Sequence, residues 1–175
     1  MPVLPDPVLL MERARWLALA DMPPVDTPPY LLCYFIGDSP AYWQAARQAA
    51  EERGIDIRVL PVTEASYQQN LPLADGASPT QWLGWLAGAA AVCTDSFHGA
   101  AFATILHKPL YLQRRYEEDD PESKNSRIDQ LLRMCYGDMQ PEDADWDAVD
   151  RNLENERTTG QLWLATTIMR ALLCG

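Results

Sequence analysis

Short apolar runs alternate along this chain with longer segments whose apolar residues recur at helical spacing. Strands that alternate with helices in this way predict an α/β fold, a doubly wound parallel sheet with right-handed crossovers. The chain has 175 residues, enough for one domain with its own core, so we expect a single domain over 1–175. The predicted strands cover residues 30–36, 55–60, 89–93 and 110–112.

Capping and breaking residues place the helices between these strands. Gly54 is expected to end one helix as its C-cap, and Ser96 to begin another. Residues 61–77 are predicted to be irregular, with a short edge strand near 69–73. The predicted helices cover residues 7–20, 41–53, 80–87, 96–107, 123–135, 145–156 and 159–173, so extra helices follow the last strand.

Charge and composition exclude several classes of protein. The net charge of -11 would repel a phosphate backbone, so nucleic acid is not an expected partner. No run reaches the roughly 18 apolar residues of a membrane helix, so we expect a chain that does not span a membrane. The four cysteines match no zinc or disulfide framework, which predicts a reducing compartment, the cytoplasm, and neither a metal nor a cofactor is expected.

The segment from Thr94 to Gly99 carries the best candidate for chemistry. It joins a predicted strand to a predicted helix, and ligands of doubly wound sheets bind where strands end. The first N–H groups of the helix after Ser96 have no intrahelical partner, and they attract anions. Gly99 permits close approach of a ligand or of backbone, and His98 can titrate near neutrality. The turn therefore predicts an anion site beside a proton donor, although histidines at helix starts often serve only structure.

Cationic side chains follow in two places. Arg114 and Arg115 come after the last strand, where a phosphate clamp would be useful, but they also fit a salt-bridged surface loop. Lys124 and Arg127 lie at a predicted helix start, where cations oppose the helix dipole, and Asn125 could donate hydrogen bonds there. Both groups are candidates for holding an anionic substrate.

Five segments resemble, in chain order, motifs of the polysaccharide pyruvyl transferases. Residues 94–99 match the family's T-D-S-F-H-G signature without a substitution. The other four segments are residues 6–10 (D-P-V-L-L), 30–35 (Y-L-L-C-Y-F), 78–83 (S-P-T-Q-W-L) and 125–132 (N-S-R-I-D-Q-L-L). The ordered set is more specific than any of its members, because Asp-Pro and Ser-Pro pairs are common.

The resemblance implies a GT-B-like enzyme of two Rossmann-like domains, of which this chain is the second. It implies transfer of pyruvate from phosphoenolpyruvate to two hydroxyls of a sugar in a cell-surface glycan precursor, free or lipid-linked, as a ketal. His98 becomes the catalytic candidate, as general acid or phosphoenolpyruvate contact. The substrate-binding candidates are Ser96, Phe97, Gly99, Asn125, Arg127 and, by position alone, Arg114.

The resemblance begins at the crossover between the two domains of the family. We therefore expect a first domain or a partner chain to be needed, and little transferase activity from this chain alone. Two alternatives stay open at this point. One is a nucleotide-sugar glycosyltransferase on the same fold, and the other is a non-catalytic interaction domain that pairs through an exposed apolar face.

Overall fold

Four short strands form one parallel sheet in the order β2-β1-β3-β4. The computed structural model describes residues 4–74, 78–115 and 125–173. The strands are β1 (Tyr30–Tyr34), β2 (Asp56–Val59), β3 (Ala91–Thr94) and β4 (Leu110–Leu112). Since β2 lies on one side of β1 and β3 on the other, the chain reverses its direction of winding between β1 and β3. Ligands bind at such a switch point in open α/β sheets.

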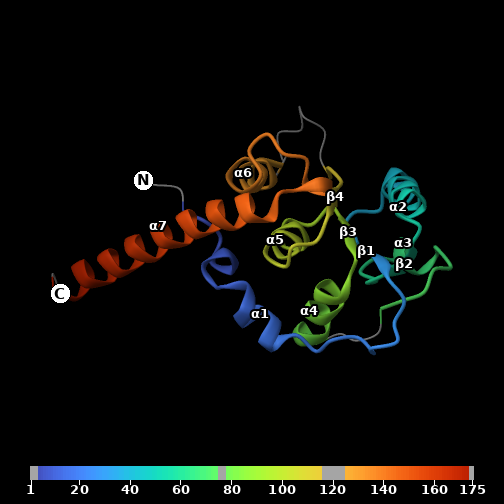
Figure 1. Ribbon diagram of the computed structural model, residues 1–175, viewed down its shortest axis with the longest axis horizontal. Helices are drawn as coiled ribbons and strands as arrows, with labels where there is room; N and C mark the ends of the chain where they lie inside the picture. Colours follow the sequence, from blue (N-terminus) through green and yellow to red (C-terminus); the bar gives the residue numbers. More distant parts are fainter. Residues whose placement is uncertain (1–3, 75–77, 116–124, 174–175) are drawn as a thin grey trace.

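Helices cover both faces of the sheet, as Figure 1 shows. Alternate residues of β1 enter two different cores: Leu31 and Cys33 face helix α2 (Pro40–Arg53), and Leu32 faces the opposite layer. That second layer holds α4 (Pro79–Gly88) and α5 (Phe97–Ile105). The predicted doubly wound α/β fold is therefore confirmed, and its Rossmann-like layering places the start of α5 at the switch point.

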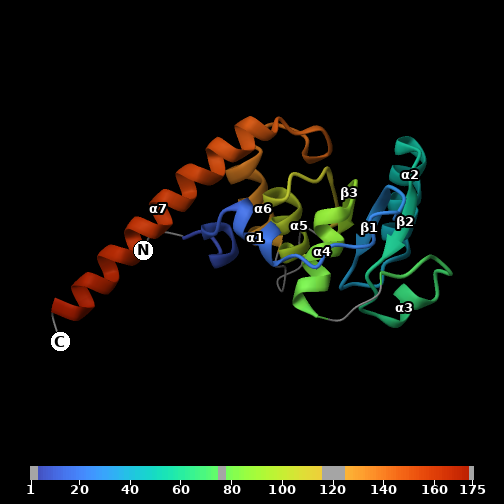
Figure 2. The ribbon, with the colours of Figure 1, turned by 60° about the horizontal axis from the view of Figure 1, so that its bottom comes forward.

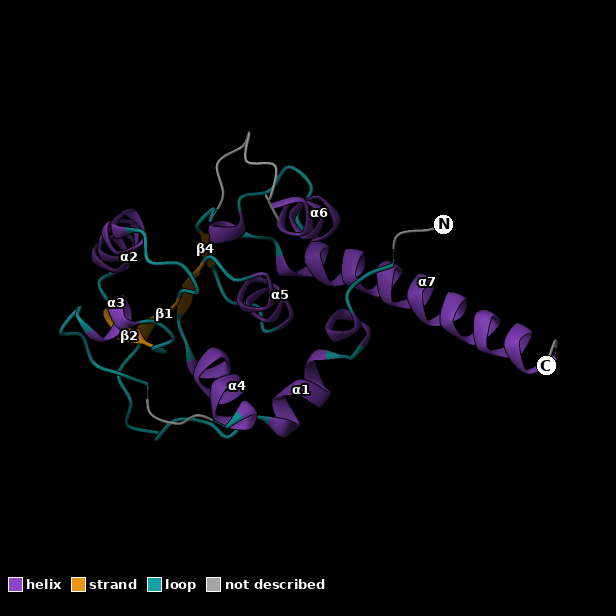
Figure 3. Ribbon diagram, turned by 180° about the vertical axis from the view of Figure 1, so that it is seen from behind, coloured by secondary structure: helices purple, strands orange, loops and turns teal. Residues whose placement is uncertain are grey.

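Six further elements are η1 (Pro7–Leu10), α1 (Arg13–Leu19), α3 (Glu64–Tyr67), α6 (Asn125–Cys135), η2 (Pro141–Asp143) and α7 (Trp146–Leu173). Most of them gather on the α5 side of the molecule, whereas η2 contacts β4 and Figure 1 shows α3 beside β2. Leu131, Val149 and Leu153 join the same core as α5. Figure 3 shows α6 and the first part of α7 beside α5, with the rest of α7 projecting away. None of the described helices is long and apolar enough to cross a membrane.

Several boundaries differ from those the sequence predicts. The helix predicted over 7–20 is two elements, because the backbone is extended at Met11 and Glu12. The two helices predicted over 145–156 and 159–173 are the single helix α7, in which the Thr159 hydroxyl donates to the Asn155 carbonyl. That bond satisfies the polar side chain within the helix, so no break is needed.

The region predicted to be irregular contains one helix that the sequence reading missed. The short helix α3 forms behind a capping box, in which Thr63 and Ser66 bond to each other's backbone and side chain. The predicted edge strand near 69–73 is reduced to one parallel bridge between Val59 and Leu73. The strand predicted over 30–36 ends at Tyr34, because the next peptide groups bond to a side chain instead.

Candidate active site

Asp95 ties together the two strands that flank the switch point. Its side chain is fully buried and accepts hydrogen bonds from the backbone N–H groups of Ile36 at 2.7 Å and Gly37 at 2.8 Å. The Nε of Arg115 donates to the same carboxylate at 3.1 Å. The buried charge is thus compensated by three donors, and the loop after β1 is held against the turn after β3.

Thr94 and Gly99 set the angle at which α5 leaves the sheet. The Thr94 hydroxyl donates to the Tyr34 carbonyl at 2.5 Å and accepts from the Ser96 N–H at 3.1 Å. A Cβ on Gly99 would lie 2.6 Å from the Thr94 Oγ1, closer than real Cβ atoms approach. The close approach that Gly99 permits is therefore made by Thr94, so the glycine shapes the turn through packing.

Ser96 caps α5 as the sequence predicts. Its Oγ accepts from the Gly99 N–H at 3.3 Å, which satisfies one of the first-turn donors of the helix. The N–H groups of Phe97 and His98 belong to the same first turn, where an α-helix provides no intrahelical acceptor. The start of α5 therefore presents its positive dipole end at the switch point.

His98 projects from this helix start toward solvent. Its side chain is 53% exposed, and its Nε2 lies 4.0 Å from the Oδ2 of Asp6. The ring also meets Phe97 edge-to-face, with the centroids 5.4 Å apart. His98 is therefore accessible to a ligand, and its imidazole lies beside Asp6 rather than in the core.

Arg127 reaches the same carboxylate from α6. Its Nη2 lies 2.9 Å from the Oδ2 of Asp6, and its guanidinium carbon lies 4.2 Å from the centroid of the Phe97 ring. Asp6 in turn caps η1 by accepting from the Val8 N–H at 3.1 Å. One carboxylate oxygen thus gathers a histidine and an arginine from two different helices, and we call Asp6, His98 and Arg127 the Asp6 cluster.

Asp6 is the residue of this cluster that the sequence reading did not select. The Asp-Pro pair predicted a helix cap, and the cap exists, but only one of the two carboxylate oxygens serves it. The signal available in the sequence was the position of Asp6 within the D-P-V-L-L segment. Its second role depends on contacts across 121 positions of the chain, which no local pattern predicts.

A pocket of about 250 Å³ opens beside the Asp6 cluster. Asp6, Phe97 and Arg127 form its polar and aromatic side, and residues of η1 and α6 form the apolar side. Asn125, at the start of α6, is buried with 6% of its surface exposed. The pocket and its neighbouring imidazole thus combine a cation, a dipole end and a titratable group.

The amino-acid sequence matches a known family. The family model described as polysaccharide pyruvyl transferase matches residues 2–112, which include Asp6, Ser96 and His98. The chain belongs to this family. Arg127 lies beyond the matched residues, so its place in the cluster rests on geometry alone.

Two other comparisons say less about this member of the pyruvyl transferase family. No curated protein matches the chain significantly. Among solved structures, the UDP-GlcNAc 2-epimerase from Methanocaldococcus jannaschii is similar, with 13% sequence identity and a TM-score of 0.48. The similarity covers 93% of this chain and 49% of that protein, so the chain spans about half the length of the epimerase.

The structure places Arg114 apart from the cluster of this pyruvyl transferase family member. Its Nη2 pairs with the Oδ1 of Asp129 at 2.7 Å. Asp129 follows Arg127 by two positions on α6, and residues two apart on a helix point to different sides. Arg114 and Arg127 therefore do not face a common anion, and Arg115 is engaged by Asp95. Lys124 and the acidic run over 117–120 lie outside the described residues.

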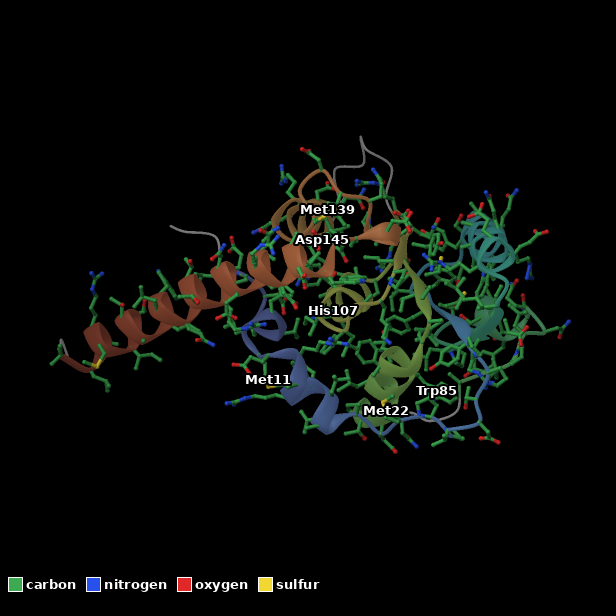
Figure 4. All side chains as sticks on the ribbon, in the orientation of Figure 1. Met11, Met22, Trp85, His107, Met139 and Asp145 are labelled. Atoms are coloured by element: carbon green, nitrogen blue, oxygen red, sulfur yellow. The ribbon has the colours of Figure 1, made fainter. Side chains whose placement is uncertain are left out.

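His107, the second of the two histidines of the chain, has a structural environment. It follows α5 with a φ of 57° and stacks on Trp146, with the ring centroids 5.0 Å apart. Arg13 Nη1 lies 3.0 Å from its Nδ1, and Asp150 Oδ1 lies 2.8 Å from its Nε2. Arginine can only donate, so Nδ1 accepts and Nε2 donates. Figure 4 shows His107 beside α5, and its contacts join α1, α5 and α7.

The described residues of this family member include neither a reactive thiol beside the signature nor a cluster of metal-binding side chains. Burial raises the pKa of the Cys93 thiol, next to the signature, to about 12, so the nucleophilic thiolate is scarce at neutral pH. Across residues 4–74, 78–115 and 125–173, no three His, Cys, Asp or Glu side chains gather as a metal site would require.

Proposed function

We propose that this chain forms the phosphoenolpyruvate-binding wall of a polysaccharide pyruvyl transferase, with His98 as the general acid. The observation that carries the proposal is the sharing of one Asp6 oxygen by His98 at 4.0 Å and Arg127 at 2.9 Å. A proton donor and an anion-binding cation therefore lie side by side at the start of α5. Phosphoenolpyruvate carries a carboxylate and a phosphate, which a cation can bind, and its methylene carbon must gain a proton in pyruvyl transfer.

Local charge favours this anion although the whole chain is acidic. Arg127 is 54% exposed, so a ligand oxygen can reach its guanidinium. Stacking on Phe97 fixes the plane of the guanidinium, which prepares it for bidentate binding of a carboxylate or phosphate. The dipole end of α5 adds a favourable field at short range. We assign Ser96, Gly99 and Asn125 to shaping this site.

The proposed reaction requires one proton transfer to carbon. His98 donates a proton to the methylene carbon of phosphoenolpyruvate, which leaves a cationic centre at the carbon bearing the phosphate. A sugar hydroxyl forms a C–O bond to that centre, and a second hydroxyl forms another as the C–O bond to phosphate breaks. Of the two hydroxyl protons released, one restores His98 and the other leaves with phosphate. A positioned acid typically contributes 10²–10⁴-fold to such a step.

The sugar acceptor, free or lipid-linked, is proposed to bind between this domain and a second one. Two substrates are oriented by binding between the two sides of a cleft, and this domain supplies only one side. We therefore propose a GT-B-like pairing with a first domain or a partner chain. We also place the reaction in the cytoplasm. The three described cysteines, Cys33, Cys93 and Cys135, are free and buried, which supports a reducing compartment.

Calorimetric titration of the chain with phosphoenolpyruvate tests the donor site. R127Q is expected to weaken binding at least about tenfold, because a charge-assisted contact is lost. R133Q, which removes an exposed arginine of the same helix, is the matched control and should leave binding unchanged. Tighter binding of a nucleotide-diphosphate sugar, unaffected by H98A, would instead favour glycosyl transfer.

The acid role of His98 is tested by phosphate release in an assay that supplies the second domain or partner chain. H98N is expected to slow release by about 10²–10⁴-fold while phosphoenolpyruvate affinity changes only a few-fold. Unchanged turnover in H98N would remove His98 from the mechanism without removing the binding site.

A further inference from the structure

The pocket beside the Asp6 cluster has one more polar side chain on its wall. Gln130 lines this pocket together with Asp6, Phe97 and Arg127. It lies on α6 three positions after Arg127, and residues three apart on an α-helix are neighbours on its surface. Figure 2 shows α6 beside α5, on the side of the sheet away from α2. The guanidinium and the amide can therefore reach the same ligand.

The amide group of Gln130 is available to such a ligand. Gln130 is partly buried, and its side chain has no hydrogen-bond partner among the residues that the structure describes. Arg127 beside it is oriented by the Asp6 carboxylate and by the ring of Phe97. A glutamine amide supplies two N–H donors, and a guanidinium only donates. The two side chains thus place N–H donors on one wall of the pocket.

The rest of the pocket wall is apolar. It is formed by Leu4, Pro5, Pro7, Leu9, Leu131 and Met134. Apolar side chains offer no hydrogen bonds, so inside the pocket only the ligand oxygens that face Arg127 and Gln130 find donors. A carboxylate has two oxygens in one plane, which a guanidinium and one amide can satisfy. A phosphate has a third free oxygen, which would be left against the apolar wall.

Charge separates the two anionic groups of phosphoenolpyruvate in the same way. The carboxylate carries one negative charge, whereas a phosphate monoester carries about −1.5 to −2 at pH 7. In the pocket, Asp6 already neutralises part of the charge of Arg127, so one added negative charge is repelled less than two. The N–H groups and the dipole at the start of α5 favour phosphate, and a protonated His98 adds positive charge there.

We propose that Gln130 and Arg127 together bind the carboxylate of phosphoenolpyruvate inside the pocket, and that the phosphate lies outside it at the start of α5. Gln130 is then a substrate-binding residue that selects donors with a carboxylate. This inference rests on the proposed function and assigns the two anionic groups of the same donor to two subsites. The phosphate lies next to the exposed His98, on the side open to solvent, from which it can leave when its C–O bond breaks.

Calorimetric titration of Q130L with phosphoenolpyruvate is the first test. Leucine is similar in size and retains helix propensity, but it removes the amide, so the affinity should fall about tenfold as a hydrogen bond to a charged group is lost. Q130E should weaken binding further, because a second carboxylate would stand beside Asp6 and repel the donor. Q140L replaces an exposed glutamine that does not line the pocket, so it is the matched control and should leave the affinity unchanged.

Two fragments of the donor test its orientation. Ethyl phosphate carries a phosphate without a carboxylate, and pyruvate carries a carboxylate without a phosphate. Ligand-observed nuclear magnetic resonance measures the dissociation constant of each fragment for the unchanged chain and for Q130L. We expect the constant of pyruvate to rise about tenfold in Q130L and that of ethyl phosphate to stay within about twofold. A purely structural role of Gln130 would weaken both fragments alike.

Three results would overturn this inference. They are unchanged phosphoenolpyruvate affinity in Q130L, an equal loss for both fragments, and a loss for ethyl phosphate alone, which would place the phosphate in the pocket. Far-ultraviolet circular dichroism verifies that Q130L and Q130E retain their helices.

The titration of R127Q separates this inference from the proposed function. Weaker binding in R127Q with unchanged binding in Q130L would leave the donor site in place and remove only the subsite of Gln130. If neither variant changes the affinity, or if the unchanged chain does not bind phosphoenolpyruvate, the proposed function fails and this inference fails with it.

Discussion

The two oxygens of the Asp6 carboxylate serve different purposes. Oδ1 accepts from the Val8 N–H and starts η1, whereas Oδ2 holds Arg127 at 2.9 Å. Oδ2 is therefore a counter-charge at a site that we propose for an anion. An incoming carboxylate or phosphate must compete with it for the guanidinium.

Replacing Asp6 with asparagine separates these purposes. Asparagine caps a helix start about as well as aspartate, so D6N should change the free energy of unfolding by less than about 1 kcal/mol. Removal of the negative charge should strengthen phosphoenolpyruvate binding about threefold to tenfold, as calorimetry can measure. D129N, which removes the partner of Arg114, is the control and should leave affinity unchanged. Weaker binding in D6N would contradict competition and show that Asp6 orients Arg127.

Among the elements, the joint between β1 and β3 depends on Asp95 more than on strand pairing. The strands are short, with four registered pairs between Leu31–Tyr34 and Ala91–Thr94. Beyond them, the loop after β1 has its N–H groups bonded to a buried carboxylate instead of another strand. The start of α5 is therefore positioned by hydrogen bonds to the Asp95 carboxylate rather than by further pairing between strands.

Replacement of Asp95 with asparagine should loosen this joint. The amide can accept fewer hydrogen bonds and carries no charge, so the bonds to Asp95 are weakened and we expect the free energy of unfolding in urea denaturation to fall by roughly 2–4 kcal/mol. Hydrogen exchange should accelerate at the amides of Ile36 and Gly37, whose acceptors are weakened. D38N, at an exposed neighbouring position, should change neither measurement. Unaltered exchange at Ile36 and Gly37 would show that the loop holds without Asp95.

For the molecule as a whole, buried thiols link stability to alkaline pH. Burial raises the pKa of Cys93 to about 12 and that of Cys135 to about 12, from an ordinary value near 9. The unfolded chain then releases these protons at lower pH than the folded chain does. Their contribution to stability is therefore present below about pH 9 and is lost as the pH rises toward 12.

Between pH 8 and pH 10, ionisation of each of these two thiols in the unfolded chain should lower the free energy of unfolding by about 1.4 kcal/mol. Urea denaturation at a series of pH values measures the loss, and C135A should show a shallower decline than the unchanged chain. An identical slope in C135A would mean that the thiol gains solvent access before the domain unfolds.

The sequence alone determined the elements whose signals act over a few residues. Alternating apolar runs fixed the strands, a glycine with a φ of 61° ended α2, and Ser96 capped α5, because period and capping are local properties. The predicted turn after β3 is present for the same reason. The candidate residues at that turn, His98 above all, could be selected from it.

Tertiary structure decided which side chains meet. Asp6 and Arg127 are 121 positions apart and come together only because η1 and α6 both pack beside α5. The same packing turned Arg114 toward Asp129 and let α7 run on past the domain as one helix. These outcomes depend on how elements share a core, and contacts between distant segments leave no periodic trace in the sequence.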